Sequence, residues 1–265
     1  MGERDLFSYH FLRESLLAPS DVWSCQHEII SGEKVIIIDN ALKNPLGLRT
    51  FAESLDYDLV SAPREFRVYP GERATVSWST DRLAECILKH YFKDNTHEHL
   101  NFKRQATVFT RMNGEKLKRI HPKQQAPHID FGQRLVALIH LSDDEYLGAT
   151  GFYRHLRTGI DCFPPVPSTY VMEKMESDGF NPLSDEDYRA FIKQILYEGL
   201  NDYACPELGT GIAASNAVWN VVGIVKARFN RLLIFPGYLI HSPIFDGYSS
   251  SGCSRVTLNL AFIPQ

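Results

Sequence analysis

Long hydrophobic runs and paired cysteines are what this sequence lacks most clearly. No apolar stretch approaches the ~20 residues that a bilayer-spanning helix requires, and the first residues contain no apolar segment of the secretory type. The five cysteines are scattered, odd in number and without a C-x-x-C pair, which argues against a disulfide framework or a structural zinc site. We therefore expect a cytoplasmic protein in a reducing environment, with no membrane partner.

The sequence also lacks an excess of positive charge. Its 28 basic and 32 acidic residues give a formal net charge of −4, so a nucleic-acid partner is not expected. One basic cluster, residues 116–123, is interpreted either as a solvated loop or as an entrance that attracts acidic substrates. With 265 residues, 44% of them hydrophobic, and no internal repeat, the chain fits one large domain with a sizeable core.

Hydrophobic periodicity predicts a helical N-terminal third. Residues 1–33 are expected to form a preamble with a short helix or two, followed by a buried strand at 34–39. Helices are predicted at 44–54, where proline occupies the first turn, and at 81–92, where apolar residues recur at helical spacing.

From residue 105 onwards the pattern is that of β structure. Segments rich in β-branched and aromatic residues predict strands at 105–111, 134–141, 151–155, 217–227, 231–235 and 254–263. A helical insertion interrupts them between 164 and 215, where Ser184 and Asp187 form a weak capping pair. We expect a mainly β protein with flanking helices, in the α+β class, whose core is a sandwich or jelly roll.

Three residues far apart in the chain have the types and spacing of a metal site. His128 and Asp130 are separated by one residue, and in an extended segment such positions point to the same face. His241 follows a predicted buried strand and a turn, so it could close the site from a facing sheet. Two imidazoles and one carboxylate on one face of Fe(II) form the facial triad of non-haem iron oxygenases.

The other histidines have weaker context. His97 and His99 also have i, i+2 spacing, but they lie in a polar connection. His140 lies within an apolar strand, where a satisfied core or pocket residue is more common than a metal ligand. The metal prediction is therefore restricted to the first three residues.

A cation follows the second histidine of the predicted site. Arg255 lies on the last predicted strand, where alternation places it on one face with Thr257 and Asn259, and places the apolar residues on the other. A row of donors on a central strand should line a wet functional cavity, because unpaired buried polar groups are costly. Arginine grips a carboxylate with two hydrogen bonds and stays charged, and Thr257 can add a hydroxyl donor. The alternative is a surface arginine on an edge strand.

Together these residues resemble the Fe(II)/2-oxoglutarate-dependent dioxygenase superfamily. Its pattern is H-x-D, a distal histidine, and an arginine or lysine some ten to fifteen residues later, matched here by Arg255-Val256-Thr257 as an R-x-S variant. Within 104–263, the apolar strand before Gly148–Arg154 and the run 230–235 look like the prolyl-hydroxylase-like branch and uncharacterised bacterial relatives. The glycine pair is split, however, and the long separation of the histidines comes mostly from the 164–215 insertion.

The resemblance implies a double-stranded β-helix (jelly roll, cupin-like) in a single oxygenase domain over 1–265. Residues 1–103 would support a core at 104–263, with 164–215 as a helical, lid-like insertion. His128, Asp130 and His241 would hold Fe(II), Arg255 and Thr257 would bind 2-oxoglutarate, and O2 would be consumed with release of succinate and CO2. The implied activity is hydroxylation of an unactivated C–H bond in an amino-acid-like, peptidyl or natural-product substrate.

Further residues are predicted with alternatives left open. Tyr153 is expected to donate to 2-oxoglutarate, Arg111 and Asn113 to face the cavity, and Arg154 to bind a substrate carboxylate; each could instead be structural. Two other functions use the same features. One is a cupin-like, non-oxidative metal enzyme, and the other is a catalytically silent binding module that keeps the fold.

Overall fold

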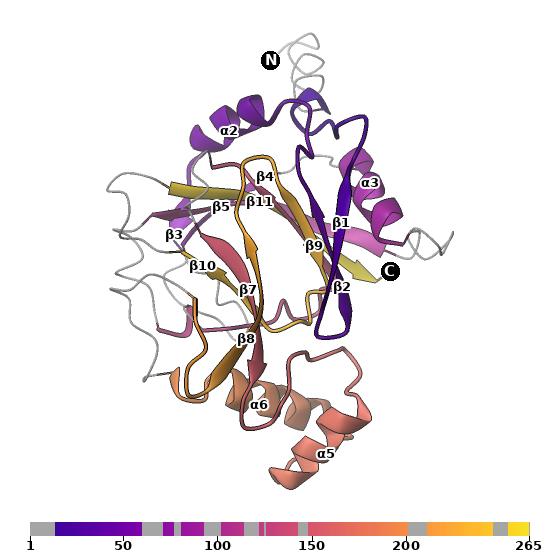
Figure 1. Ribbon diagram of the computed structural model, residues 1–265, viewed down its shortest axis with the longest axis vertical. Coiled ribbons are helices and arrows are strands. Elements are labelled where there is room, and N and C mark those ends of the chain that lie inside the picture. The colour runs from indigo at the N-terminus through magenta and orange to yellow at the C-terminus, as the bar shows by residue number, and fades with distance from the viewer. Residues whose placement is uncertain are drawn as a thin grey trace.

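The computed structural model shows a mainly β protein built from two antiparallel sheets with helices on either side (Figure 1). The structure describes residues 14–59, 71–76, 81–92, 102–113, 122–124, 126–142, 148–200, 211–245 and 254–264. Among these, no helix is both long and apolar enough to cross a membrane.

The larger sheet has eight strands in the order β1-β2-β9-β6-β11-β5-β4-β3. Its strands are β1 (Cys25–Ile30), β2 (Glu33–Ile38), β3 (Asp58–Leu59), β4 (Glu72–Val76), β5 (Phe102–Asn113), β6 (Leu135–His140), β9 (Leu232–Phe235) and β11 (Ser254–Pro264). The smaller sheet has the order β10-β7-β8. It contains β7 (Ala149–His155), β8 (Trp219–Lys226) and β10 (His241–Ile244).

Two helices cover the outer face of the larger sheet. They are α2 (Pro45–Glu53) and α3 (Asp81–Tyr91), whose apolar residues join one cluster with the side chains of β5, β6, β9 and β11. Asn44 caps α2 by accepting the N–H of Gly47, and proline occupies the first turn of that helix. The helix boundaries predicted from the sequence are therefore confirmed within a residue or two.

Alternation along β11 separates the core from the inner face of the sheet. Val256, Leu258, Leu260 and Phe262 belong to the cluster under α2 and α3. Arg255 and Thr257 therefore point the opposite way, toward the smaller sheet. A second cluster, which includes Phe152 of β7 and Leu233 and Phe235 of β9, fills the space between the two sheets.

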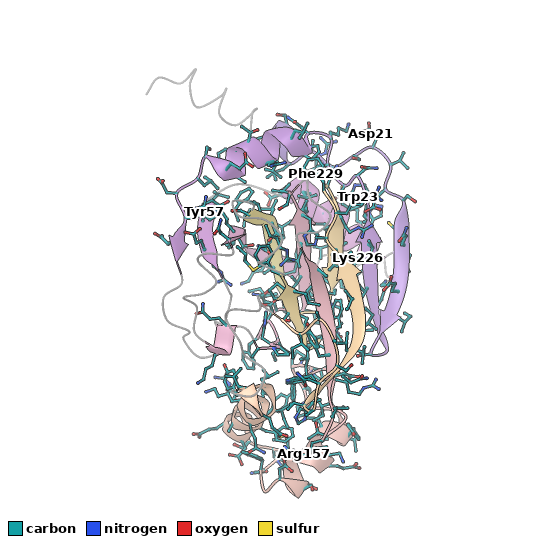
Figure 2. The ribbon with its side chains drawn as sticks, turned by 60° about the vertical axis from the view of Figure 1, so that its left-hand side comes forward. Asp21, Trp23, Tyr57, Arg157, Lys226 and Phe229 are labelled. Atoms are coloured by element: carbon teal, nitrogen blue, oxygen red, sulfur yellow. The ribbon has the colours of Figure 1, made fainter. Side chains whose placement is uncertain are left out.

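The insertion packs on the outer face of the smaller sheet. Its helices, α5 (Thr169–Ser177) and α6 (Asp185–Leu196), share a cluster with Tyr153 and Trp219. Figure 2 shows Arg157 beside this part of the molecule, at the opposite end from Trp23 and Tyr57. The guanidinium of Arg157 forms ion pairs with Asp178 and Glu198, at the ends of the two helices, and so ties them to the end of β7.

The strands predicted from the sequence are confirmed, but others were missed. The interpretation of residues 1–33 as a helical preamble is wrong over 25–30, where β1 pairs with β2. Nor were β4 and β10 predicted from the sequence. Each of these three strands has only four to six residues without a regular alternation of apolar and polar side chains, so its own periodicity is weak.

Candidate functional site

Backbone pairing brings the two predicted histidine ligands together. The N–H of His128 donates to the carbonyl of His241 at 2.8 Å, and the N–H of His241 donates back to His128 at 2.9 Å. His128 forms an isolated bridge rather than part of a longer strand, and His241 is the first residue of β10. The N–H of Asp130 donates to the carbonyl of Gly237 at 2.8 Å, which fixes the second half of the H-x-D segment.

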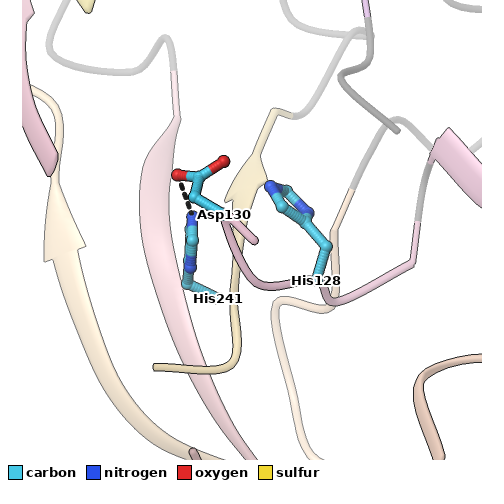
Figure 3. A group of neighbouring side chains, drawn as sticks. All are labelled: His128, Asp130 and His241. Carbon is cyan, nitrogen blue, oxygen red and sulfur yellow. Dashed lines mark ion pairs between the residues drawn. The ribbon is translucent and has the colours of Figure 1, made fainter. Parts of the chain in front are cut away.

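The side chains of these three residues converge at one point (Figure 3). One ligand atom from each of His128, Asp130 and His241 lies within 4.8 Å of the other two. Nε2 of His241 is 3.4 Å from Oδ2 of Asp130, and the two imidazole centroids are 4.6 Å apart. Both histidines are buried and Asp130 is partly exposed. The prediction that these three residues meet is therefore confirmed.

Hydrogen bonds to the backbone set the orientation of both imidazoles. Nδ1 of His241 is 2.8 Å from the carbonyl of Leu239, and Nδ1 of His128 is 3.3 Å from the carbonyl of Ala126. A carbonyl only accepts, so in each ring Nδ1 carries the hydrogen and Nε2 keeps its lone pair. Proteins orient metal-binding histidines in the same way, through a hydrogen bond from the ring nitrogen that does not face the metal.

The neighbours of the ligands support them from behind. Ile129, between His128 and Asp130, and Ile240, before His241, both belong to the cluster beneath α5 and α6. Because alternate residues of an extended chain point to opposite faces, burial of these two isoleucines directs the ligands to the other side. The packing of α5 and α6 on these two isoleucines therefore helps to orient the side chains of the three ligands.

Local electrostatics favour the protonation states that bind a cation. Burial, together with the charge of nearby His241, lowers the pKa of His128 to about 4. Burial alone would raise the pKa of Asp130, but interaction with His241, and the charges of His128 and Arg73, hold it below its usual value. At neutral pH the site therefore presents a neutral imidazole and a carboxylate, as metal ligation requires.

The donor set fits a divalent transition metal. Two donor atoms that lie about 2.1 Å from one ion at right angles are about 3 Å apart, which is close to the 3.4 Å between His241 and Asp130. Two imidazoles and one carboxylate suit Fe(II) and leave room for further ligands, and the same set can also hold other divalent ions. The geometry supports a metal site without choosing the metal.

A row of polar side chains crosses the inner face of the larger sheet. Thr257 of β11 lies directly opposite Thr110 of β5, and their hydroxyl groups are hydrogen-bonded. Nδ2 of Asn259 donates to the hydroxyl of Thr110 at 2.9 Å and to that of Thr257 at 3.3 Å. Arg255, on the same face of β11, has an exposed fraction of only 3%. The predicted row of donors on this strand is therefore confirmed.

Two residues outside the predicted set extend this row. Arg73 of β4 lies opposite Thr110, and His140 of β6 lies opposite Thr257. The polar row is thus His140, Thr257, Thr110 and Arg73, on four adjacent strands. Arg73 was missed because the strand that carries it was not predicted from the sequence. His140 was interpreted as a satisfied core or pocket residue, but within the described parts of the chain neither of its ring nitrogens has a hydrogen-bond partner.

Two residues that were predicted to face a cavity lie on the outer face of the larger sheet instead. Arg111 lies opposite Val256 and Asn113 lies opposite Ser254, so both share the face of β11 that packs under the helices. Arg111 forms an ion pair with Glu72 at 2.9 Å and lies over the ring of Tyr57. Asn113 donates to the hydroxyl of Ser254 at 3.3 Å. The prediction for these two residues is wrong, because the register of β5 assigns the inner face to Thr110 and Met112.

We expect Arg111→Met to lower stability without affecting co-substrate affinity. The change removes an ion pair from Glu72, whose side chain is 6% exposed, so the free energy of unfolding should fall by about 1–3 kcal/mol. Thermal unfolding and titration with 2-oxoglutarate would be measured on the same sample. A marked loss of affinity in a folded variant would restore Arg111 to the site.

The last two predicted site residues are engaged elsewhere. The hydroxyl of Tyr153 donates to the carbonyl of Ile212 at 3.0 Å and lies 2.9 Å from the hydroxyl of Ser242. Its hydrogen is thus already used on the insertion side of the smaller sheet, which leaves no donor for a co-substrate. Arg154 is exposed and binds Asp161 through two nitrogens. Residues 116–119 of the basic cluster and His97 and His99 lie outside the described residues.

Comparison with known protein families gives one match. Residues 23–190 match the model of a family of unknown function, DUF6445. The chain belongs to this family. Because the match ends at residue 190, it includes His128 and Asp130 but not His241 or Arg255. Among proteins of curated function, none matches the sequence.

Solved structures with a similar fold are distant in sequence. HygX from Streptomyces hygroscopicus, with nickel and 2-oxoglutarate bound, is 11% identical over 87% of this chain and 83% of its own, with a TM-score of 0.42. The non-haem α-ketoglutarate-dependent epimerase SnoN from nogalamycin biosynthesis is 10% identical over 99% and 82%, with a TM-score of 0.45. A prolyl 4-hydroxylase from Phytophthora capsici is 9% identical over 87% and 58%, with a TM-score of 0.39. At these sequence identities and TM-scores, the function of the three proteins is not transferred to this chain.

Proposed function

We propose that the protein is an Fe(II)- and 2-oxoglutarate-dependent oxygenase that hydroxylates a C–H bond of its substrate. The observation that carries the proposal is the convergence of His128, Asp130 and His241, with both Nε2 atoms available for a metal. A buried arginine on the inner face of the opposite sheet adds the cation that an acidic co-substrate needs.

The order of the strands supports the double-stranded β-helix that the sequence resemblance implies. The larger sheet contains β9-β6-β11-β5 as neighbours, and the smaller one contains β10-β7-β8 with His128 bridged to β10. Because the two sheets face each other, a co-substrate bound between them would have His128 and His241 on the side of the smaller sheet and Arg255 on the side of the larger. Two open sheets are sufficient for this arrangement, and the sheet does not have to close into a barrel.

Each residue of the site has a separate task in this proposal. His128, Asp130 and His241 would hold the iron, and the hydrogen bonds that their backbone N–H groups make keep the three residues in place. Bound iron, with O2 and 2-oxoglutarate, supplies the oxidising chemistry. Arg255 and Thr257 bind the distal carboxylate of 2-oxoglutarate, and the hydroxyl network around Thr110 orients Thr257.

Succinate formation is the test of this function. The iron-loaded protein would be incubated with 2-oxoglutarate, ascorbate and pools of candidate metabolites, and succinate would be quantified alongside the masses of the products. We expect succinate together with a product that has gained one oxygen atom. Iron binding without any succinate would favour a cupin-like, non-oxidative enzyme, and failure to bind iron would favour a silent binding module.

A second proposal concerns the charge of the substrate, which we infer to be acidic. The structure removes Arg154 from this role, but it places Arg73 on the polar row, and the charge of Arg73 acts on both His128 and Asp130. A fixed cation whose charge acts on two of the proposed metal ligands favours an amino-acid-like or peptidyl substrate with a carboxylate.

We expect Arg73→Met to discriminate between acidic and neutral substrates. The methionine keeps most of the length but loses the charge, so kcat/KM for an acidic substrate should fall about 10- to 100-fold, whereas the affinity for 2-oxoglutarate should be unchanged. Arg73→Lys should retain part of the activity. Equal turnover of acidic substrates and their neutral analogues by the native protein would contradict the proposal.

A further inference from the structure

The imidazole of His140 is a buried polar group for which the described part of the chain offers no partner. His140 lies on β6 with an exposed fraction of 1%, and neither Nδ1 nor Nε2 makes a hydrogen bond to a described residue. The backbone of His140 is fully used, since its N–H donates to Arg231 and its carbonyl accepts from Asn230. Buried polar side chains in folded proteins are nearly always hydrogen-bonded, so an imidazole that has no partner among the described residues is suited to a bound ligand.

The register of the sheet shows which way this imidazole points. His140 lies directly opposite Thr257, and directly opposed residues of antiparallel strands share a face. The neighbouring residues Ala137 and Ile139 belong to the cluster under α2 and α3, on the other face. His140 therefore points to the inner face, on the side that carries Thr257 and Arg255.

The surroundings of His140 keep it neutral. Burial, and the charges of Arg255 on β11 and of Arg231 at the start of β9, lower its pKa well below the usual value. Asp39 holds Arg231 in an ion pair at 2.6 Å, so that charge is largely compensated. A neutral imidazole has one N–H donor and one acceptor, and it can donate to an anion without adding another positive charge beside Arg255.

We propose that His140 donates a hydrogen bond to the distal carboxylate of the bound 2-oxo dicarboxylate and thereby selects it over 2-oxo monocarboxylates. The inference rests on the proposed function, because it takes 2-oxoglutarate as the co-substrate. Arg255 provides the charge and Thr257 a hydroxyl. The two oxygens of a carboxylate have about four acceptor sites, which is enough for all three groups. His140 thus binds the co-substrate directly and does not bind the metal.

The test is a binding titration of the iron-loaded protein without oxygen. Two ligands would be compared by calorimetry: 2-oxoglutarate, and 2-oxopentanoate, which has the same carbon chain but lacks the distal carboxylate. For His140→Leu we expect affinity for 2-oxoglutarate to fall about 10- to 100-fold, and affinity for 2-oxopentanoate to stay within about twofold. His140→Gln keeps an N–H donor and should recover much of the lost affinity.

Stability measurements separate this role from simple packing. Because leucine removes an unsatisfied polar group, His140→Leu should unfold at the same temperature as the native protein or higher. His140→Phe provides a second apolar variant of larger volume, for which the same pair of affinities is expected. His155→Leu is the matched control, since His155 is equally buried but belongs to the insertion side, and it should leave both affinities unchanged.

The outcomes distinguish this inference from the proposed function. Equal affinity of the native and His140→Leu proteins for 2-oxoglutarate would overturn the role of His140 and leave the function standing. An equal loss for both ligands would also overturn it, because the effect would then not depend on the distal carboxylate. A native protein that takes up iron but does not bind 2-oxoglutarate would overturn the proposed function and this inference with it.

Discussion

Replacing either histidine of the triad, in His128→Ala or His241→Ala, should abolish both iron binding and succinate formation. Each histidine provides an Nε2 held in place by a hydrogen bond from Nδ1 to the backbone, and alanine provides no ligand. Loss of an outer-shell partner alone typically costs about 10- to 100-fold in metal affinity or activity, so loss of a ligand should cost more. Iron content after anaerobic loading and the rate of succinate release are the two measurements.

The structure supplies controls for this prediction. The hydrogen bonds that join residue 128 to residue 241 are between backbone atoms, so the alanine variants should keep the fold and unfold in one transition. His27→Ala changes an exposed histidine on β1 and should bind one iron per chain like the native protein. Full iron content in a folded His241→Ala protein would show that the iron binds at another site.

Replacing the buried arginine, in Arg255→Ala, should raise the concentration of 2-oxoglutarate needed for half-maximal turnover by about 100-fold or more. Arg255 is 3% exposed and lies on the inner face of β11 with Thr257, where its guanidinium could donate two charged hydrogen bonds to a bound carboxylate. Iron binding should be unchanged, because Arg255 is not among the converging ligand atoms. Apparent KM for 2-oxoglutarate and iron stoichiometry would be measured together.

Two further variants make the result specific. Arg255→Lys keeps the charge but loses the two-pronged geometry, so its KM should lie between those of the native and alanine proteins. Arg111→Met removes an arginine from the opposite face of the same sheet and should leave KM unchanged. An unchanged requirement for 2-oxoglutarate in Arg255→Ala would mean that this residue is not the anchor.

The residues of the metal site could be predicted because their chemistry is local and specific. An H-x-D segment places two ligands on one face of any extended chain, and a histidine after a buried strand can approach from another sheet. Alternation along the last strand predicted that Arg255 and Thr257 would face away from the core, and the cluster that contains Val256 and Leu258 confirms it.

The side chains that were assigned to the wrong partners or the wrong face share one feature: their surroundings are set by residues far away in the chain. Arg111 and Thr110 are adjacent, and which of them faces the inner side depends only on how β5 pairs with β11. A shift of one residue in register moves every side chain to the other face, and no local pattern in a strand with polar residues on both faces selects between the two registers. Tyr153 and Arg154 lie in the Gly148–Arg154 run that resembles the family, but their partners, Ile212 and Asp161, come from other parts of the chain.

Side-chain chemistry and the period of two along a strand were enough to predict a mainly β chain and the metal ligands His128, Asp130 and His241. They were also enough to predict an arginine and a threonine on one face of the final strand. The backbone pairing of His128 with His241, the presence of Arg73 and His140 in the polar row and the exclusion of Arg111 from it became known from the three-dimensional fold alone. Such relations depend on pairing between residues far apart in the chain, and the free energy that selects one pairing comes from packing two whole sheets together rather than from any single segment.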